Sequence, residues 1–134
     1  MAHHLSFDRM VNYDSGHSGI SFAVELRMGK FGLSVPAKVD TGSTHCLFME
    51  TVGRELGIEI ETGEPLTIST VTGSFRSYGH WVTLVSEELE FDSMLFFAAD
   101  QRLGRNILGR YGWLDRMIIG INDYDGKLYL SRHK

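Results

Sequence analysis

The residues of this chain best suited to chemistry are an acid and its neighbours, Val39-Asp40-Thr41-Gly42-Ser43. An aspartate at the tip of a buried turn is held away from bulk water, and its carboxylate can act there as a general acid or base. Gly42 lets the main chain turn tightly, so that its amide can donate a hydrogen bond to the carboxylate. Asp-Thr-Gly alone is a weak signal, and the alternative is an ordinary turn in which the aspartate caps its own backbone.

The segments around the acid must present it on a turn between strands. Residues 20–26 alternate apolar and polar side chains, as a half-buried strand does. A turn at 29–32 and a return strand from 33 make a hairpin that leads directly into Asp40. Leu47 and Phe48 continue the apolar pattern beyond the motif. The sequence therefore predicts that Asp40 lies where one strand ends and the chain turns toward the next.

The rest of the chain reads as short apolar stretches separated by glycines, which favours a mostly β domain. A helix is expected at residues 50–56, where Gly57 can close its end as a left-handed cap, and a second short helix at 111–117. Further strands are expected at 66–68, 81–85, 94–98, 106–109 and 127–130, with turns at 71–75 and 122–126. Residues 1–19 carry little pattern and predict either a loose arm or an added strand before a domain of residues 20–134.

The motif around Asp40 and two further segments together resemble motifs of the retropepsin-like aspartic peptidases. This family includes retroviral proteases and cellular single-domain relatives. One segment is similar to the second signature of that family, an apolar strand that packs beside the active-site turn and leads into a helix. Its residues here are Ile107, Leu108, Gly109 and Arg110. The other stands where the family places its flap, a hairpin that folds over the substrate, with residues Val71, Thr72, Gly73 and Ser74. The resemblance spans roughly residues 20–131 and is much more specific than the tripeptide.

The resemblance implies an all-β fold, a closed β-barrel of the acid-protease type with one or two short helices. It also implies a homodimer in which each copy supplies one Asp40, on a turn formed with Thr41, Gly42 and Ser43. Two carboxylates this close share one proton, so the ionised one can activate a water and the protonated one can donate to the peptide carbonyl. The implied function is an aspartic endopeptidase that needs no metal and no cofactor. The chain contains a single Asp-Thr-Gly, as half of such a site requires.

The chain departs from the retroviral pattern beside the acid. Ser43 stands in place of an alanine, and a hydroxyl near the carboxylate would stabilise its ionised form, so an acidic activity optimum is expected. Thr44 replaces an acid that pairs with the second-signature arginine in retroviral members, so Arg110 must find another partner. The flap is also less rich in glycine than in retroviral enzymes.

Two alternatives stay open. The first is a catalytically silent dimeric module that binds an extended peptide or a partner protein. The second is a peptidase domain cut from a larger protein. Asp40→Asn separates the enzyme from the silent module, because only the enzyme would lose an activity.

Other reactive residue types have ordinary explanations. His17, His45 and His80 lack the spacing of metal ligands and are expected to be solvated or structural, although His45 would lie near the substrate groove of this fold. Cys46 stands in an apolar strand and is expected to be a buried, inert thiol. Aromatic residues of the expected strands and second helix are assigned to the core rather than to specificity pockets: Trp81, Phe91, Phe96, Phe97 and Trp113.

Composition excludes several classes of function. The formal net charge of -4 and the lack of a basic block give nucleic-acid binding no electrostatic support. No apolar run reaches the length of a membrane span. A lone cysteine rules out an intrachain disulfide and fits a reducing compartment, and no signal peptide is recognisable, so the expected location is the cytoplasm. The expected partners are a second copy of the chain and a peptide or protein substrate.

Overall fold

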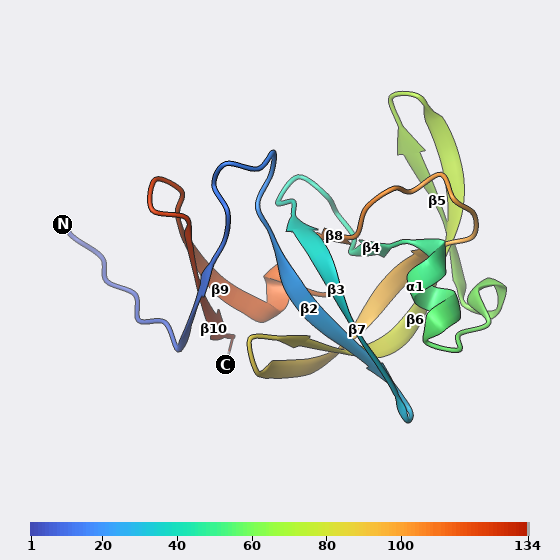
Figure 1. Cartoon of the computed structure of the whole chain (residues 1–134), viewed down its shortest axis with the longest axis horizontal. Coiled ribbons are helices and arrows are strands. Elements are labelled where there is room, and N and C mark those ends of the chain that lie inside the picture. Colours follow the sequence, from blue (N-terminus) through green and yellow to red (C-terminus); the bar gives the residue numbers. More distant parts are fainter. Residues whose placement is uncertain (134) are drawn as a thin grey trace.

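The computed structural model describes residues 1–133, and strands dominate it (Figure 1). The strands are β1 (Arg9–Asn12), β2 (Ser21–Met28), β3 (Phe31–Val39), β4 (Leu47–Phe48), β5 (Glu64–Thr70), β6 (Gly73–Ser86), β7 (Leu89–Ala98), β8 (Ile107–Leu108), β9 (Met117–Asn122) and β10 (Lys127–Arg132). The helical segments are α1 (Glu50–Glu55) and the short 3-10 helices η1 (Ile60–Thr62) and η2 (Leu114–Arg116). The expected all-β class is confirmed. Lys134, the last residue of the expected domain, lies outside the described residues.

The larger sheet has the strand order β2-β3-β8-β4-β7-β6-β5. β2 also pairs with β6 through Glu25, Leu26 and Arg27, so the sheet curls back on itself. β4 and β8 are two-residue strands, so the pairings that they form with neighbouring strands involve few residues. The expected barrel is therefore present as a strongly curled sheet without regular closure.

The core fills the inside of this curled sheet. Phe22, Val24 and Leu26 of β2 are buried while the residues between them are more exposed, since successive side chains of a strand face opposite sides. Trp113 is completely buried and packs against Phe22, with ring centroids 6.1 Å apart. Its indole N–H donates to the Ser86 hydroxyl at 3.0 Å. That hydrogen bond removes the cost of burying the polar end of the ring.

The first expected helix is confirmed and the second is wrong. α1 ends before Gly57, whose φ of +76° is the left-handed conformation that a glycine cap adopts. In the segment 111–117 only η2 forms. Gly112 has a φ of +104° and interrupts a helical path there, and β9 already begins at Met117. Within residues 1–133, no helix is long and apolar enough to cross a membrane.

A separate three-stranded sheet has the order β1-β10-β9 and lies beside the curled sheet (Figure 1). β1 pairs antiparallel with β10, so residues 1–19 include an added strand. Tyr13, just after β1, donates its hydroxyl to Asp123 Oδ1 at 2.6 Å. Burial and the neighbouring carboxylate raise the pKa of Tyr13 to about 12. The first part of the chain is thereby tied to the turn between β9 and β10.

Candidate active site

Asp40 directly follows β3, on the turn that leads toward β4. Its amide donates to the Leu108 carbonyl at 3.0 Å, and its carbonyl accepts from the Ser43 amide at 3.1 Å. The Gly42 amide donates to Asp40 Oδ1 at 3.0 Å, as the sequence predicts. Asp40 Oδ2 accepts no hydrogen bond from the described residues. The turn therefore fixes the aspartate while one carboxylate oxygen stays available for chemistry.

The second-signature segment packs against this turn, as expected. β8 pairs in parallel with the end of β3, with Leu108 opposite Val39. Just after β8, the Arg110 amide donates to the Ser43 carbonyl at 2.9 Å, and the Tyr111 amide donates to the Thr44 carbonyl at 2.9 Å. These main-chain bonds hold the active-site turn against the segment that follows β8.

Gly109 makes this close approach possible. A Cβ at Gly109 would lie 2.2 Å from the His45 carbonyl oxygen and 2.7 Å from the Ser43 carbonyl oxygen, so only a hydrogen fits there. The Gly109 amide donates to Cys46 Sγ at 3.3 Å. Cys46 is completely buried, and burial raises the pKa of its thiol to about 12. The expected buried thiol is confirmed.

Two neighbours of the acid make contacts that differ from the retroviral pattern. The Ser43 hydroxyl donates to the His45 carbonyl at 2.7 Å rather than to the Asp40 carboxylate. The contact expected between that hydroxyl and the carboxylate is therefore wrong, because the His45 carbonyl lies within its reach. The Arg110 guanidinium lies over the Tyr111 ring, 5.7 Å from the ring centroid. It makes no ion pair with the described residues, so the aromatic ring replaces the missing acid.

The expected flap residues lie at the tip of the β5–β6 hairpin, which projects beyond the rest of the sheet (Figure 1). Val71 and Thr72 form the turn, and the Val71 side chain is fully exposed. Gly73 has a φ of +144°, which favours glycine at this position. The Ser74 carbonyl accepts a hydrogen bond from Arg102 Nη1 at 2.7 Å. The hairpin is therefore tied on one side to the loop between β7 and β8.

A groove of about 360 Å³ separates the active-site turn from β5. One wall is the chain from Gly42 to His45 together with Leu47, and the other consists of Leu66, Thr67, Ile68 and Ser69. The groove thus runs between the turn that carries Asp40 and the strand that leads into the flap. Its volume and its mixed polar and apolar lining suit a short segment of extended polypeptide.

Comparison with known proteins decides the fold. No protein-family model and no curated protein matches the chain. A retropepsin-like aspartic protease from Rickettsia conorii superposes with a TM-score of 0.66 at 16% identity, over 92% of this chain and 97% of that one. The EIAV protease complexed with the inhibitor HBY-793 superposes with a TM-score of 0.54 at 17% identity, over 69% of this chain and 83% of that one. This is a retropepsin fold.

Within the retropepsin fold, His45 lies at the groove, as expected. Its ring packs edge-on against Phe96 and Tyr111, with centroids 4.9 Å and 5.9 Å away. Burial lowers the pKa of His45 from its ordinary value of 6.5, because the charged imidazolium loses hydration there. A neutral, aromatic side chain therefore forms this end of the groove near neutral pH.

The other histidines are solvated or structural, as expected. His17 lies at the surface, with Nε2 3.1 Å from Asp14 Oδ2. His80 Nε2 lies 2.8 Å from the Ile60 carbonyl oxygen. In the part of the chain that the structure describes, no group of three or more His, Cys, Asp or Glu side chains is arranged to hold a metal ion.

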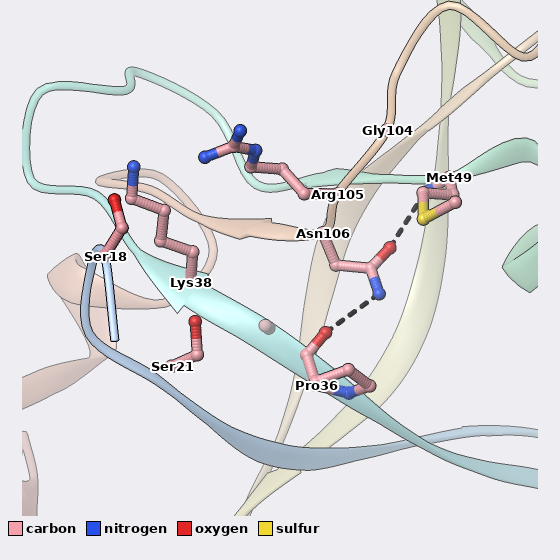
Figure 2. Close-up of a pocket in the computed structure, with 9 residues that line it drawn as sticks. Ser18, Ser21, Pro36, Lys38, Met49, Gly104, Arg105 and Asn106 are labelled. Atoms are coloured by element: carbon pink, nitrogen blue, oxygen red, sulfur yellow. Dashed lines mark hydrogen bonds between the residues drawn. The ribbon is translucent and has the colours of Figure 1, made fainter. Parts of the chain in front are cut away.

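Asn106 supports the site in a way that the sequence analysis missed. It is buried, its Nδ2 donates to the Pro36 carbonyl at 2.9 Å, and its Oδ1 accepts from the Met49 amide at 2.9 Å (Figure 2). It therefore joins β3, the start of β8 and the residue before α1. Its only sequence signal is a polar residue directly before an apolar strand, which is too common to single it out.

Of the aromatic residues assigned to the core, Trp81 is the exception. Phe91, Phe96, Phe97 and Trp113 are buried, whereas 63% of Trp81 is exposed. Trp81 precedes the buried Val82 on β6, and successive side chains face opposite sides of a strand, so its ring lies on the outer face.

Proposed function

We propose that this protein is an aspartic endopeptidase that acts as a homodimer, with one Asp40 from each copy. The observation that carries the proposal is the hydrogen-bonded Asp40 turn beside a groove, on a retropepsin fold. A single carboxylate cannot be general base and general acid in the same step, and the chain has one Asp-Thr-Gly. A second copy would supply the missing carboxylate.

In the proposed reaction, the two Asp40 carboxylates share one proton because both cannot ionise cheaply at close range. The ionised carboxylate takes a proton from a water as the water oxygen attacks the scissile carbonyl carbon. The protonated carboxylate donates its proton to the carbonyl oxygen. When the tetrahedral intermediate collapses, the C–N bond breaks and its electron pair stays on nitrogen, which takes the proton that the first carboxylate removed from the water and leaves as an amine. One hydroxyl of the intermediate returns its proton to the second carboxylate as the C=O bond re-forms, so the product is a carboxylic acid and the pair again shares one proton. The bond from Gly42 holds one oxygen of each carboxylate throughout and leaves the other for proton exchange.

The substrate in this proposal is an extended peptide in the groove beside β5. Main-chain groups of the flap hairpin would bind it in the manner of an added strand. Leu47, Leu66 and Ile68 give the groove apolar contacts for substrate side chains. The exposed tip at Val71 and Thr72 makes few contacts of its own, so it can close over a bound peptide with little cost.

The three-stranded sheet bears on how the proposed dimer forms. β1 is already paired with β10 of the same chain, so β1 is not free to pair with a second copy along that edge. The outer edges of β1 and β9 have no partner strand among the described residues. Ile118 and Ile121 on β9 are partly exposed, which provides apolar area next to one of these edges.

Cleavage of an unbiased peptide mixture across acidic to neutral pH tests the proposal, with Asp40→Asn and a pepstatin-type inhibitor as controls. The wild-type protein is expected to cleave, and Asp40→Asn is expected to lose cleavage while keeping the dimer mass in light scattering. Cleavage that survives in Asp40→Asn would contradict the paired-aspartate mechanism. A dimer that cleaves nothing but binds peptides would favour the silent module instead.

A further inference from the structure

A second cavity, of about 390 Å³, lies between β3, the segment before β2 and the segment before β8. Its polar lining comes from Ser18, Ser21, Lys38, Arg105 and Asn106. Figure 2 shows the Lys38 ammonium and the Arg105 guanidinium extending toward the same side of this cavity, with Ser18 next to Lys38. Two cationic groups and the Ser18 hydroxyl therefore lie on one side of the cavity.

Among residues 1–133, no carboxylate lines this cavity and no carboxylate pairs with its two cations. Neither Lys38 nor Arg105 forms an ion pair within residues 1–133. Arg54, by contrast, contacts the carboxylates of both Glu50 and Glu61. Two like charges that share a cavity repel each other, and an anion placed between them would relieve that repulsion.

The stem of Lys38 packs against the main chain before β2. Lys38 is half-buried, and its stem passes directly over Gly19. A Cβ on Gly19 would come within 2.8 Å of Lys38 Cε, so the glycine makes room for the lysine stem. Gly19 also has a φ of +83°, a backbone conformation that L side chains rarely adopt. Gly19 therefore leaves room for the lysine stem beside the cavity.

The cavity lies along the strand that leads into the Asp40 turn. Lys38 belongs to β3, and Asp40 directly follows that strand, two residues further along the chain. The Lys38 amide donates to the carbonyl of Asn106, the residue next to Arg105, at 2.9 Å. Both cations thus belong to the segments whose pairing builds the candidate active site.

We propose that this cavity is a substrate subsite for an acidic side chain, so that the peptidase prefers Asp or Glu near the scissile bond. The inference rests on the proposed function. Lys38 and Arg105 would donate charge-assisted hydrogen bonds to the substrate carboxylate, which are stronger than those made to a neutral amide. Pro36, Ala37 and Met49 complete the lining and give the methylene groups of a glutamate apolar contacts.

Matched peptides test the subsite. A peptide cleaved by the wild-type protein is resynthesised with Glu or Gln at each position flanking the cleaved bond, and kcat/KM is measured for every pair. At one position the Glu peptide is expected to be cleaved about tenfold faster, in line with the strength of one charge-assisted hydrogen bond. That preference should shrink in Lys38→Met and in Arg105→Gln, and should also shrink as salt concentration rises. Lys30→Met, at the exposed turn between β2 and β3, is the matched control and should keep the full preference.

The outcomes separate this inference from the proposed function. Equal rates for Glu and Gln peptides at every position, with cleavage still abolished in Asp40→Asn, would contradict the subsite but would support the proposed peptidase activity. If nothing is cleaved, titration calorimetry on Asp40→Asn decides the question, with extended peptides that are identical except for Glu or Gln at one central position. Tighter binding of the Glu peptide, lost when Lys38→Met is added, supports the subsite even in a silent module. Equal binding of the two peptides overturns it.

Discussion

A Cβ on Gly109 would lie 2.2 Å from the carbonyl oxygen of His45, closer than any carbon and oxygen can approach without a shift of the backbone. Gly109→Ala is therefore expected to push the segment after β8 away from the active-site turn. The expected cost is about 3 kcal/mol of unfolding free energy, with loss of peptide cleavage. Urea unfolding and the cleavage assay measure the two effects.

Gly104→Ala provides the matched control in the same stretch of chain. A Cβ at Gly104 would meet nothing within 4 Å, so its unfolding free energy should change by less than about 0.5 kcal/mol. Equal unfolding free energies of the two alanine variants would contradict this prediction, because they would show that the backbone accommodates a Cβ at Gly109 without loss of stability.

Asn106→Ala removes both side-chain hydrogen bonds that join β3 to the start of α1. The Pro36 carbonyl and the Met49 amide would lose their partners. A destabilisation of about 1 to 2 kcal/mol is expected, because each of the two lost hydrogen bonds contributes about 1 kcal/mol to stability. The midpoint of urea unfolding reports this change. Asn12→Ala, at an exposed position of β1, should leave the midpoint nearly unchanged, and a comparable shift there would contradict the bracing role of Asn106.

Cys46 should resist thiol reagents in the folded protein. Burial raises the pKa of its thiol to about 12, so almost no thiolate is present near pH 8, and the sulfur is inaccessible. The cysteine is the only one in the chain, so labelling with a chromogenic disulfide reports on it alone. Labelling is expected only after denaturant is added. Fast labelling without denaturant would show that the segment around β4 opens readily.

His45 should make the protein less stable as the pH falls. Folding lowers the pKa of His45 below 6.5. At pH values around and between the folded-state and unfolded-state pKa values, the unfolded chain therefore binds more protons than the folded one. Its contribution to stability is therefore complete above the unfolded pKa and is lost as the pH drops below it. When the pH is lowered from neutral to mildly acidic, the melting temperature of His45→Gln is expected to fall less than that of the wild-type protein.

His17→Gln serves as the control for this pH effect. His17 lies at the surface beside Asp14, so its removal should leave the acid-induced loss of melting temperature nearly as large as in the wild-type protein. Parallel losses in all three proteins would mean that groups other than His45 cause the acid sensitivity.

The local features of the fold follow from the sequence because neighbouring residues determine them. The hairpin before Asp40, the Gly57 cap and the tip of the β5–β6 hairpin at Val71 and Thr72 each depend on residue types within one short segment. The bond from Gly42 to the Asp40 carboxylate is of the same kind, since it spans two residues.

What the sequence does not reveal depends on contacts between distant segments. The second helix fails because β9 takes over at Met117, in pairing with β10. The Ser43 hydroxyl donates to the His45 carbonyl, and the path of the chain through His45 brings that acceptor to it. Lys38 and Arg105 lie far apart in sequence, and their shared cavity appears only once β3 and β8 have paired.

The pairing of β1 with β10 joins two strands that are synthesised at different times, one near the start of translation and one near its end. β1 leaves the ribosome well before β10 has been synthesised, so the curled sheet can begin to form while β1 still lacks its partner strand. Contacts between such distant segments also form slowly in a complete chain. During that interval the unpaired edge of β1 can accept β10 from another copy.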